Sequence, residues 1–183
     1  DENGKYTLAP NNITINSNIL VSDDTQLLND LRLLNSVKNI KIDSVGKINL
    51  NLVQGVPGCG KTTYILNNYK QGDLILFPTR DSAQDFRRRF RNTYPNINNT
   101  KINNTFRTVH SFIINLTQHL KQGQKYERLI VDEALMLHAG EIIYAAVLAG
   151  AKETMLVGDL NQIPYINRTE SLEVKFHNIA EIA

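Results

Sequence analysis

Eight consecutive residues carry the clearest chemistry in this sequence. They fit the phosphate-binding pattern Gly-x-x-x-x-Gly-Lys-[Ser/Thr] without substitution: Gly55, Val56, Pro57, Gly58, Cys59, Gly60, Lys61 and Thr62. In such a loop the backbone N–H groups surround an anion, the lysine reaches the β- and γ-phosphates, and the threonine hydroxyl binds Mg²⁺. The pattern makes no demand on Cys59, which we interpret as a small loop residue. We predict that residues 55–63, which include Thr63, bind ATP or another nucleoside triphosphate together with Mg²⁺.

Two further groups of polar residues could complete a hydrolytic site. Asp132 and Glu133 follow the apolar run Arg128–Val131, and we expect that run to form a strand beside the strand that precedes the loop. Asp132 would then bind Mg²⁺ opposite Thr62, and Glu133 would act as general base toward water. Gln162 lies in the stretch Gly158–Pro164 after another apolar run. Its side-chain amide can both donate and accept hydrogen bonds. This chemistry suits a residue that senses a γ-phosphate or positions water. Asp159, in the same stretch, could restrain Gln162.

The elements that must position these residues are indicated by hydrophobic periodicity. Strands are predicted over 47–54, 73–78, 128–132 and 154–159, and helices from Lys61, from Asp81 or Ser82 through Phe90, over 111–120 and over 139–148. The interval 92–105 shows no periodicity and is expected to be a surface loop. Arg87, Arg88, Arg89 and Arg91 form a basic helix face that either is solvated or contacts RNA. The alternation of strand and helix predicts an α/β fold with a mostly parallel sheet and helices on both faces.

The composition sets limits on the class of protein. The chain has 183 residues, a net charge of +2 and one cysteine, so an internal disulfide or a cysteine-rich zinc site is excluded within it. The charge is too small to indicate nucleic-acid binding by itself. No apolar run is long enough to span a bilayer. We expect a flanking segment over 1–45, with a helix over 26–34, the main domain over 46–170 and a tail over 171–183. Because the chain starts without methionine, we expect it to be excised from something longer.

Five blocks of the sequence resemble viral superfamily 1 RNA helicases of the alphavirus-like supergroup, most closely the replication proteins of tobamovirus-like plant viruses. They occur in that family's order: Gly-Val-Pro-Gly-Cys-Gly-Lys-Thr (55–62), Leu-Ile-Leu-Phe-Pro-Thr-Arg (74–80), Arg-Thr-Val-His-Ser-Phe (107–112), Val-Asp-Glu-Ala-Leu-Met-Leu-His (131–138) and Val-Gly-Asp-Leu-Asn-Gln-Ile-Pro-Tyr-Ile-Asn-Arg (157–168). Together they cover the chain from about Lys47 to Arg168. The resemblance implies a RecA-like P-loop NTPase domain, the first of two, within a replicase protein.

The same resemblance implies roles for individual residues. Lys61, Thr62, Asp132, Glu133 and Gln162 would serve the nucleotide. The residues near a path for single-stranded or duplex RNA would be Pro78, Thr79, Arg80, Thr108, His110 and Ser111. In close relatives an aspartate can stand at the position of His110. The implied partners are RNA and other replicase domains or proteins, and the implied location is the host cytoplasm, at membrane-associated replication complexes.

The chain departs from this family in its length. Only fifteen residues follow Arg168, whereas a second RecA-like domain would need on the order of a hundred. That domain would supply an arginine finger and the partner for relative motion. We therefore expect this chain alone to bind NTP–Mg²⁺ weakly, to hydrolyse it slowly and to unwind nothing. Two alternatives remain open: a nucleotide-binding RNA-interaction or scaffolding module of a replication complex, and a small P-loop kinase.

Overall fold

A computed structural model gives the fold of the chain. It describes residues 48–115, 126–162, 165 and 166, together with single positions at 31, 35, 38 and 179. The predicted helix over 26–34 lies outside the described residues except for Leu31, which is helical but exposed. The tail over 171–183 also lies outside them, apart from position 179. The domain boundaries expected at 45 and 170 therefore stay predictions.

The described strands form one parallel sheet of five. Its spatial order is β1-β5-β4-β2-β3, with strands β1 (Leu50–Gln54), β2 (Asp73–Phe77), β3 (Phe106–Thr108), β4 (Arg128–Val131) and β5 (Glu153–Gly158). The expectation that the strand before Asp132 lies beside the strand before the phosphate loop is wrong, because β5 lies between them. All five strands still end at the same edge of the sheet, so the loops that follow them share that edge.

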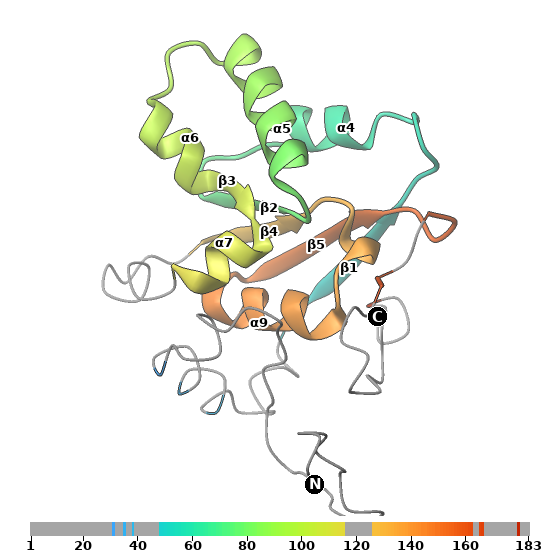
Figure 1. The fold of residues 1–183 in the computed structure, drawn as a ribbon. Helices are drawn as coiled ribbons and strands as arrows, with labels where there is room; N and C mark the ends of the chain where they lie inside the picture. Colours follow the sequence, from blue (N-terminus) through green and yellow to red (C-terminus); the bar gives the residue numbers. More distant parts are fainter. Residues whose placement is uncertain are drawn as a thin grey trace, which may run out of the picture.

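Helices cover both faces of the sheet, as predicted (Figure 1). One face packs against α4 (Lys61–Asn67), α5 (Arg80–Thr93) and α6 (Asn99–Thr105), and the other packs against α7 (Val109–Ile114) and α9 (Ala139–Ala149). The residues of β2 divide between these two layers because successive strand side chains point to opposite faces. Ile75 and Phe77 join the first core, with Phe86 and Phe90 of α5, while Leu74 and Leu76 join the second. All of β2 is buried, as a central parallel strand requires.

Helix α5 starts earlier than the sequence indicated. Its N-cap is Thr79, whose Oγ1 accepts a hydrogen bond from the N–H of Ser82 at 3.2 Å. The prediction of Asp81 or Ser82 as the cap is therefore wrong: both lie within the first turn, where Asp81 complements the helix dipole.

A further correction concerns the interval 92–105, which was expected to be a surface loop. Its second half forms α6. Asn98 caps this helix by accepting from the N–H of Thr100 at 2.7 Å, and Ile102 is its only buried residue. A helix of two turns with one buried side chain produces no repeating apolar pattern, which is why periodicity did not reveal it.

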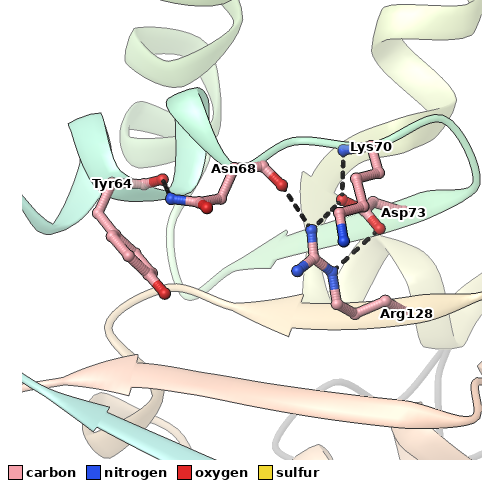
Figure 2. A network of polar contacts seen from close by, with 5 residues as sticks. All are labelled: Tyr64, Asn68, Lys70, Asp73 and Arg128. Carbon is pink, nitrogen blue, oxygen red and sulfur yellow. Dashed lines mark hydrogen bonds and ion pairs between the residues drawn. The ribbon is translucent and has the colours of Figure 1, made fainter.

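A polar network closes the opposite, amino-terminal edge of the sheet (Figure 2). Arg128 at the start of β4 donates from Nε and Nη2 to the two carboxylate oxygens of Asp73, at 3.1 and 2.7 Å. Its Nη2 also donates to the carbonyl of Asn68, at the end of α4, at 2.7 Å. Asp73 additionally accepts from the N–H of Lys70 at 2.8 Å. The network therefore fixes the far end of the helix that begins at the phosphate loop.

Candidate nucleotide and nucleic-acid site

The phosphate loop joins β1 to α4, in the strand–loop–helix context that the pattern requires. Helix α4 begins after Gly60 without any side-chain cap, and the first N–H groups of a helix have no acceptor within it. Gly60 has φ of +92° and Gly58 has φ of +76°, a backbone region that side chains disfavour. The glycines thus leave the amides at the start of α4 available to an anion.

The side chain of Lys61 folds back over this loop. Its Nζ donates to the carbonyl oxygens of Gly55 at 2.9 Å and Val56 at 3.3 Å. The loop is also closely packed at Gly55, where an added Cβ would lie 2.5 Å from Cys59 Sγ and 3.3 Å from Lys61 Cγ. Gly55 therefore has a steric role as well as a backbone role: it makes room for the lysine that would contact phosphate.

The acidic pair follows β4, at the same edge of the sheet. Asp132 is only 5% exposed, and burial together with the nearby Glu133 raises its pKa to about 6. The N–H of Glu133, the positive charge of Lys61 and a hydrogen bond from the Thr62 hydroxyl act in the opposite direction on this pKa. Lys61 and Thr62 of α4 thus lie close to Asp132, although β1 and β4 are not neighbours.

Glu133 is held in a costly conformation. Its φ of 49° and ψ of 43° lie in the left-handed region, and it is the only non-glycine with positive φ among the described residues. Strain of this kind costs on the order of 1 kcal/mol and clusters at functional sites. One carboxylate oxygen, Oε2, is buried with no hydrogen-bond partner in the described part of the chain. Glu133 is therefore a strained acid with an unused buried acceptor.

The loop after β5 forms the third part of this edge. The N–H of Gly55 donates to the carbonyl of Gly158 at 3.0 Å, which places the phosphate loop directly beside this segment. Asp159, 1% exposed, accepts from the N–H of Asn161 through its side chain and from the N–H of Gln162 through its carbonyl. Gln162 is half-buried in this turn. None of the hydrogen bonds among the described residues joins its side chain to Lys61 or Asp132.

The residues predicted to lie near RNA gather at the ends of β2 and β3. These strands are paired so that Phe77 lies opposite Thr108. Thr79 and Thr108 each cap the helix that follows, and Thr108 accepts from the N–H of Ser111 at 3.1 Å. Pro78 is half-buried and lies directly before Thr79. The hydroxyl groups of both threonines thus have a structural role, whatever else they contact.

Four of these six residues also line one open cavity of about 450 Å³ between α5 and α7. Its full lining is Arg80, Ala83, Gln84, Arg87, Arg107, Thr108, His110, Ser111, Ile114 and Asn115. Sequence reasoning missed Arg107, Gln84 and Asn115. A charged residue inside a short apolar strand was the only signal that could have revealed Arg107, which is 8% exposed.

Four of the five arginines of α5, at positions 87, 88, 89 and 91, do not form the single basic face that the sequence indicated. Arg87 donates from Nε to the carbonyl of Phe106 at 2.7 Å. Arg88 and Arg89 both pair with Asp85, and Arg91 donates to the side chain of Asn99 at 3.0 Å. Of these four arginines only Arg87 lines the cavity, so the other three charges belong to the outer surface of the helix.

None of the helices in the described part of the chain has the length and apolar character needed to cross a membrane.

Comparison with known proteins gives a consistent result. Residues 51–180 match the family described as viral superfamily 1 RNA helicase core domain. The replicase large subunit of Tobamovirus Ob is 36% identical over 88% of the chain, and that of soil-borne wheat mosaic virus is 30% identical over 98%. The replication protein alpha-A of barley stripe mosaic virus is 30% identical over 97%.

These relatives are much longer than this chain. The chain spans 10% of the length of the two replicase large subunits and 16% of the replication protein alpha-A. Among solved structures, a Pif1 helicase aligns with 83% of the chain and 36% of its own length, with a TM-score of 0.39 and 16% identity. That structural likeness is too low to bear on function.

Proposed function

The chain belongs to the viral superfamily 1 RNA helicase core domain family, and we propose that it is the NTP-hydrolysing motor domain of a replicase protein that unwinds RNA. The fold is the RecA-like α/β arrangement that the sequence predicted. The observation that carries the proposal is that Lys61 and Thr62 lie close enough to Asp132 for both to lower the pKa of its carboxyl. Residues of two separate sequence blocks thus meet at one edge of the sheet, and the bond from Gly55 to Gly158 joins a third block to them.

The residues present fit an NTP with Mg²⁺. Bound Mg²⁺ would neutralise charge that develops on the β- and γ-phosphates. Thr62 and Asp132 would hold it, since Mg²⁺ is usually bound by one or two protein oxygens together with phosphates and waters. The carboxyl of Asp132 is kept protonated up to about pH 6 by burial and by Glu133, and a cation beside it would favour its ionised form. The buried, unused Oε2 of Glu133 adds a second acceptor at this site.

Each side chain at the site would have a separate role in hydrolysis. Lys61, now bonded to the carbonyls of Gly55 and Val56, would exchange these partners for phosphate oxygens. Glu133 would accept the proton of the attacking water as general base. Gln162, in the loop beside Gly55, would orient that water or sense the γ-phosphate. Backbone N–H groups of the loop that are not bonded elsewhere, such as those of Gly58 and Gly60, would donate to the phosphates, whereas Pro57 has no N–H and would only shape the loop.

RNA would contact the ends of β2 and β3 through Pro78, Thr79, Arg80, Thr108, His110 and Ser111. The support for this is that β2 is the neighbour of β4, so the two kinds of site lie at the same sheet edge. In a replicase protein a second motor domain would move against this one and couple hydrolysis to unwinding. Other replicase components would be its partners, at membrane-associated complexes in the host cytoplasm.

Hydrolysis of ATP, measured with and without single-stranded RNA in the full-length replicase protein, tests the proposal. We expect RNA to stimulate hydrolysis, and duplex RNA to be separated only when ATP and Mg²⁺ are present. Transfer of phosphate to a small metabolite, with no effect of RNA, would instead identify a kinase. Binding of nucleotide and RNA without any hydrolysis would identify a scaffolding module.

A further inference from the structure

The cavity between α5 and α7 lies at the outer edge of the sheet. β3 is the last strand in the sheet order and contacts both helices, and Figure 1 shows it between them. Among the described residues that line the cavity none is acidic, whereas three are arginines: Arg80, Arg87 and Arg107. The charge of this cavity is therefore of one sign.

The arrangement of α5 explains which arginines face the cavity. Arg80, Gln84 and Arg87 are spaced at i, i+4 and i+7, so they lie along one stripe of the helix. Arg88 is rotated away by a further 100° or so, and it pairs with Asp85 instead. On its cavity side the helix thus presents arginines without an acidic partner among the described residues, whereas on its outer side Arg88 and Arg89 share Asp85.

Arg87 has the geometry of a direct anion contact. Its Nε is bonded to the carbonyl of Phe106 at 2.7 Å, which fixes the plane of the guanidinium. Its two terminal nitrogens have no hydrogen-bond partner among the described residues, so they can still donate. Burial lowers the pKa of Arg87, and the charge of Arg91 lowers it further. An anion in the cavity would stabilise the charged guanidinium against both effects.

Arg107 lines the opposite wall of the cavity. Its Nη2 donates to both the carbonyl and the hydroxyl oxygen of Ser111, each at 2.8 Å. These bonds join β3 to the first turns of α7, where His110 and Ser111 face the cavity. Burial lowers the pKa of Arg107 against the raising effect of Tyr126, and Arg87 lowers it as well. The two guanidinium groups are thus close enough to repel each other.

We propose that this cavity is a subsite for one backbone phosphate of single-stranded RNA, with Arg87 as the direct contact and Arg107 as a positioning residue that holds α7. The inference rests on the proposed function, because it takes RNA as the anion. Arg80 and His110, both exposed at the rim, extend the polar surface outward, as a strand that passes through the cavity requires. An RNA backbone phosphate and a free phosphate ion offer the same oxygen acceptors to Arg87, so a free phosphate ion is the alternative occupant.

Binding of a fluorescein-labelled oligouridylate to the chain, followed by anisotropy over a series of salt concentrations, tests the subsite. Arg87→Gln should weaken RNA binding roughly tenfold and reduce the salt-dependence slope by about 0.7, the contribution of one phosphate contact to a single strand. Arg88→Gln is the matched control, because it removes the same charge from the same helix outside the cavity. It should leave the slope unchanged.

A second pair of variants keeps the test valid if Arg87→Gln fails to fold. Gln84→Glu adds a negative charge to the exposed cavity side of α5, and we expect it to weaken RNA binding. Asn92→Asp makes the same amide-to-acid change on α5 outside the cavity, and we expect no weakening. For Arg107→Lys, which keeps the charge but loses the paired bonds to Ser111, we expect weaker RNA binding with an unchanged salt slope.

The outcomes separate the subsite from the function it rests on. Equal effects of Arg87→Gln and Arg88→Gln, or of Gln84→Glu and Asn92→Asp, would overturn the subsite, since only general electrostatics would remain. Inorganic phosphate that displaces RNA more strongly than chloride at equal ionic strength would point to a free-ion site instead. Failure of the wild-type chain to bind RNA at any salt concentration would contradict the proposed function itself.

Discussion

The N–H of Gly55 donates a hydrogen bond to the carbonyl oxygen of Gly158 at 3.0 Å. This bond extends the β1–β5 pairing by one step beyond the strands, so the phosphate loop starts where the loop carrying Asp159 and Gln162 starts. Two sequence blocks that are about a hundred residues apart are thereby joined by a single backbone contact. The sheet consequently sets where the two loops that carry Lys61 and Gln162 begin.

The close packing at Gly55 predicts a specific loss of nucleotide binding. In Gly55→Ala the new Cβ would lie 2.5 Å from Cys59 Sγ and 3.3 Å from Lys61 Cγ, so Cys59 must move and the lysine must shift by a few tenths of an ångström. We expect nucleotide affinity to fall at least tenfold, which corresponds to about 1.4 kcal/mol, with a small change in unfolding free energy. Titration with a fluorescent ATP analogue measures the affinity.

The same titration in a Cys59→Ala background provides the control for this packing argument. Because the closest atom to the new Cβ is then absent, Gly55→Ala should cost less affinity there than in the wild-type background. Equal costs in both backgrounds would mean that the contact with Cys59 is not the cause.

The raised pKa of Asp132 predicts a pH dependence of Mg²⁺–nucleotide binding. Affinity should fall as the pH drops through about 6, where this carboxyl gains its proton. Glu133→Gln removes a charge that raises this pKa, so the midpoint should move to lower pH. Nucleotide phosphates also titrate near pH 6, and the shift between the two proteins is therefore the quantity to measure.

The same group affects folding stability with a defined sign. Between its ordinary pKa of 3.8 and about 6, Asp132 keeps a proton in the folded chain that the unfolded chain releases. Its contribution to stability is therefore present below pH 3.8 and is lost as the pH rises through about 6. Denaturant titrations of wild type and Asp132→Asn, compared across this window, should diverge as the pH rises. Parallel pH profiles would mean that burial does not raise this pKa.

The ion pair at the amino-terminal edge should be important for stability but not for chemistry. The side chains of Arg128 and Asp73 are 13% and 2% exposed, and removing one partner of a buried pair typically costs about 3–5 kcal/mol. We expect Arg128→Met to lower the free energy of unfolding by roughly that amount. Lys152→Met breaks an exposed pair with Glu127 and should change stability little. Chemical denaturation compares the two, and equal effects would contradict the structural role of the network.

Local sequence patterns predicted much of this fold, and the residues explain where they failed. Strand β2 and the phosphate loop were predictable because their signals lie within a few consecutive residues. The position of β5 between β1 and β4 was not, since strand order depends on pairing between distant segments. Helix α6 was missed because Ile102 is its only buried residue. The role of Arg107 was missed because it depends on hydrogen bonds to Ser111, which the fold brings near it. Asp132 lies close to Thr62 although β5 separates β4 from β1, and the roles of both residues toward Mg²⁺ stay predictions.

The most direct test of the account is the effect of Glu133→Gln on RNA-stimulated ATP hydrolysis in the full-length replicase protein. We expect turnover to fall by about 10²–10⁴, the usual contribution of a general base, with nucleotide affinity retained. The control is Glu127→Gln, at the other end of β4, which should hydrolyse ATP like the wild type. Hydrolysis that survives in Glu133→Gln at the level of Glu127→Gln would contradict the assignment of this acid as the base.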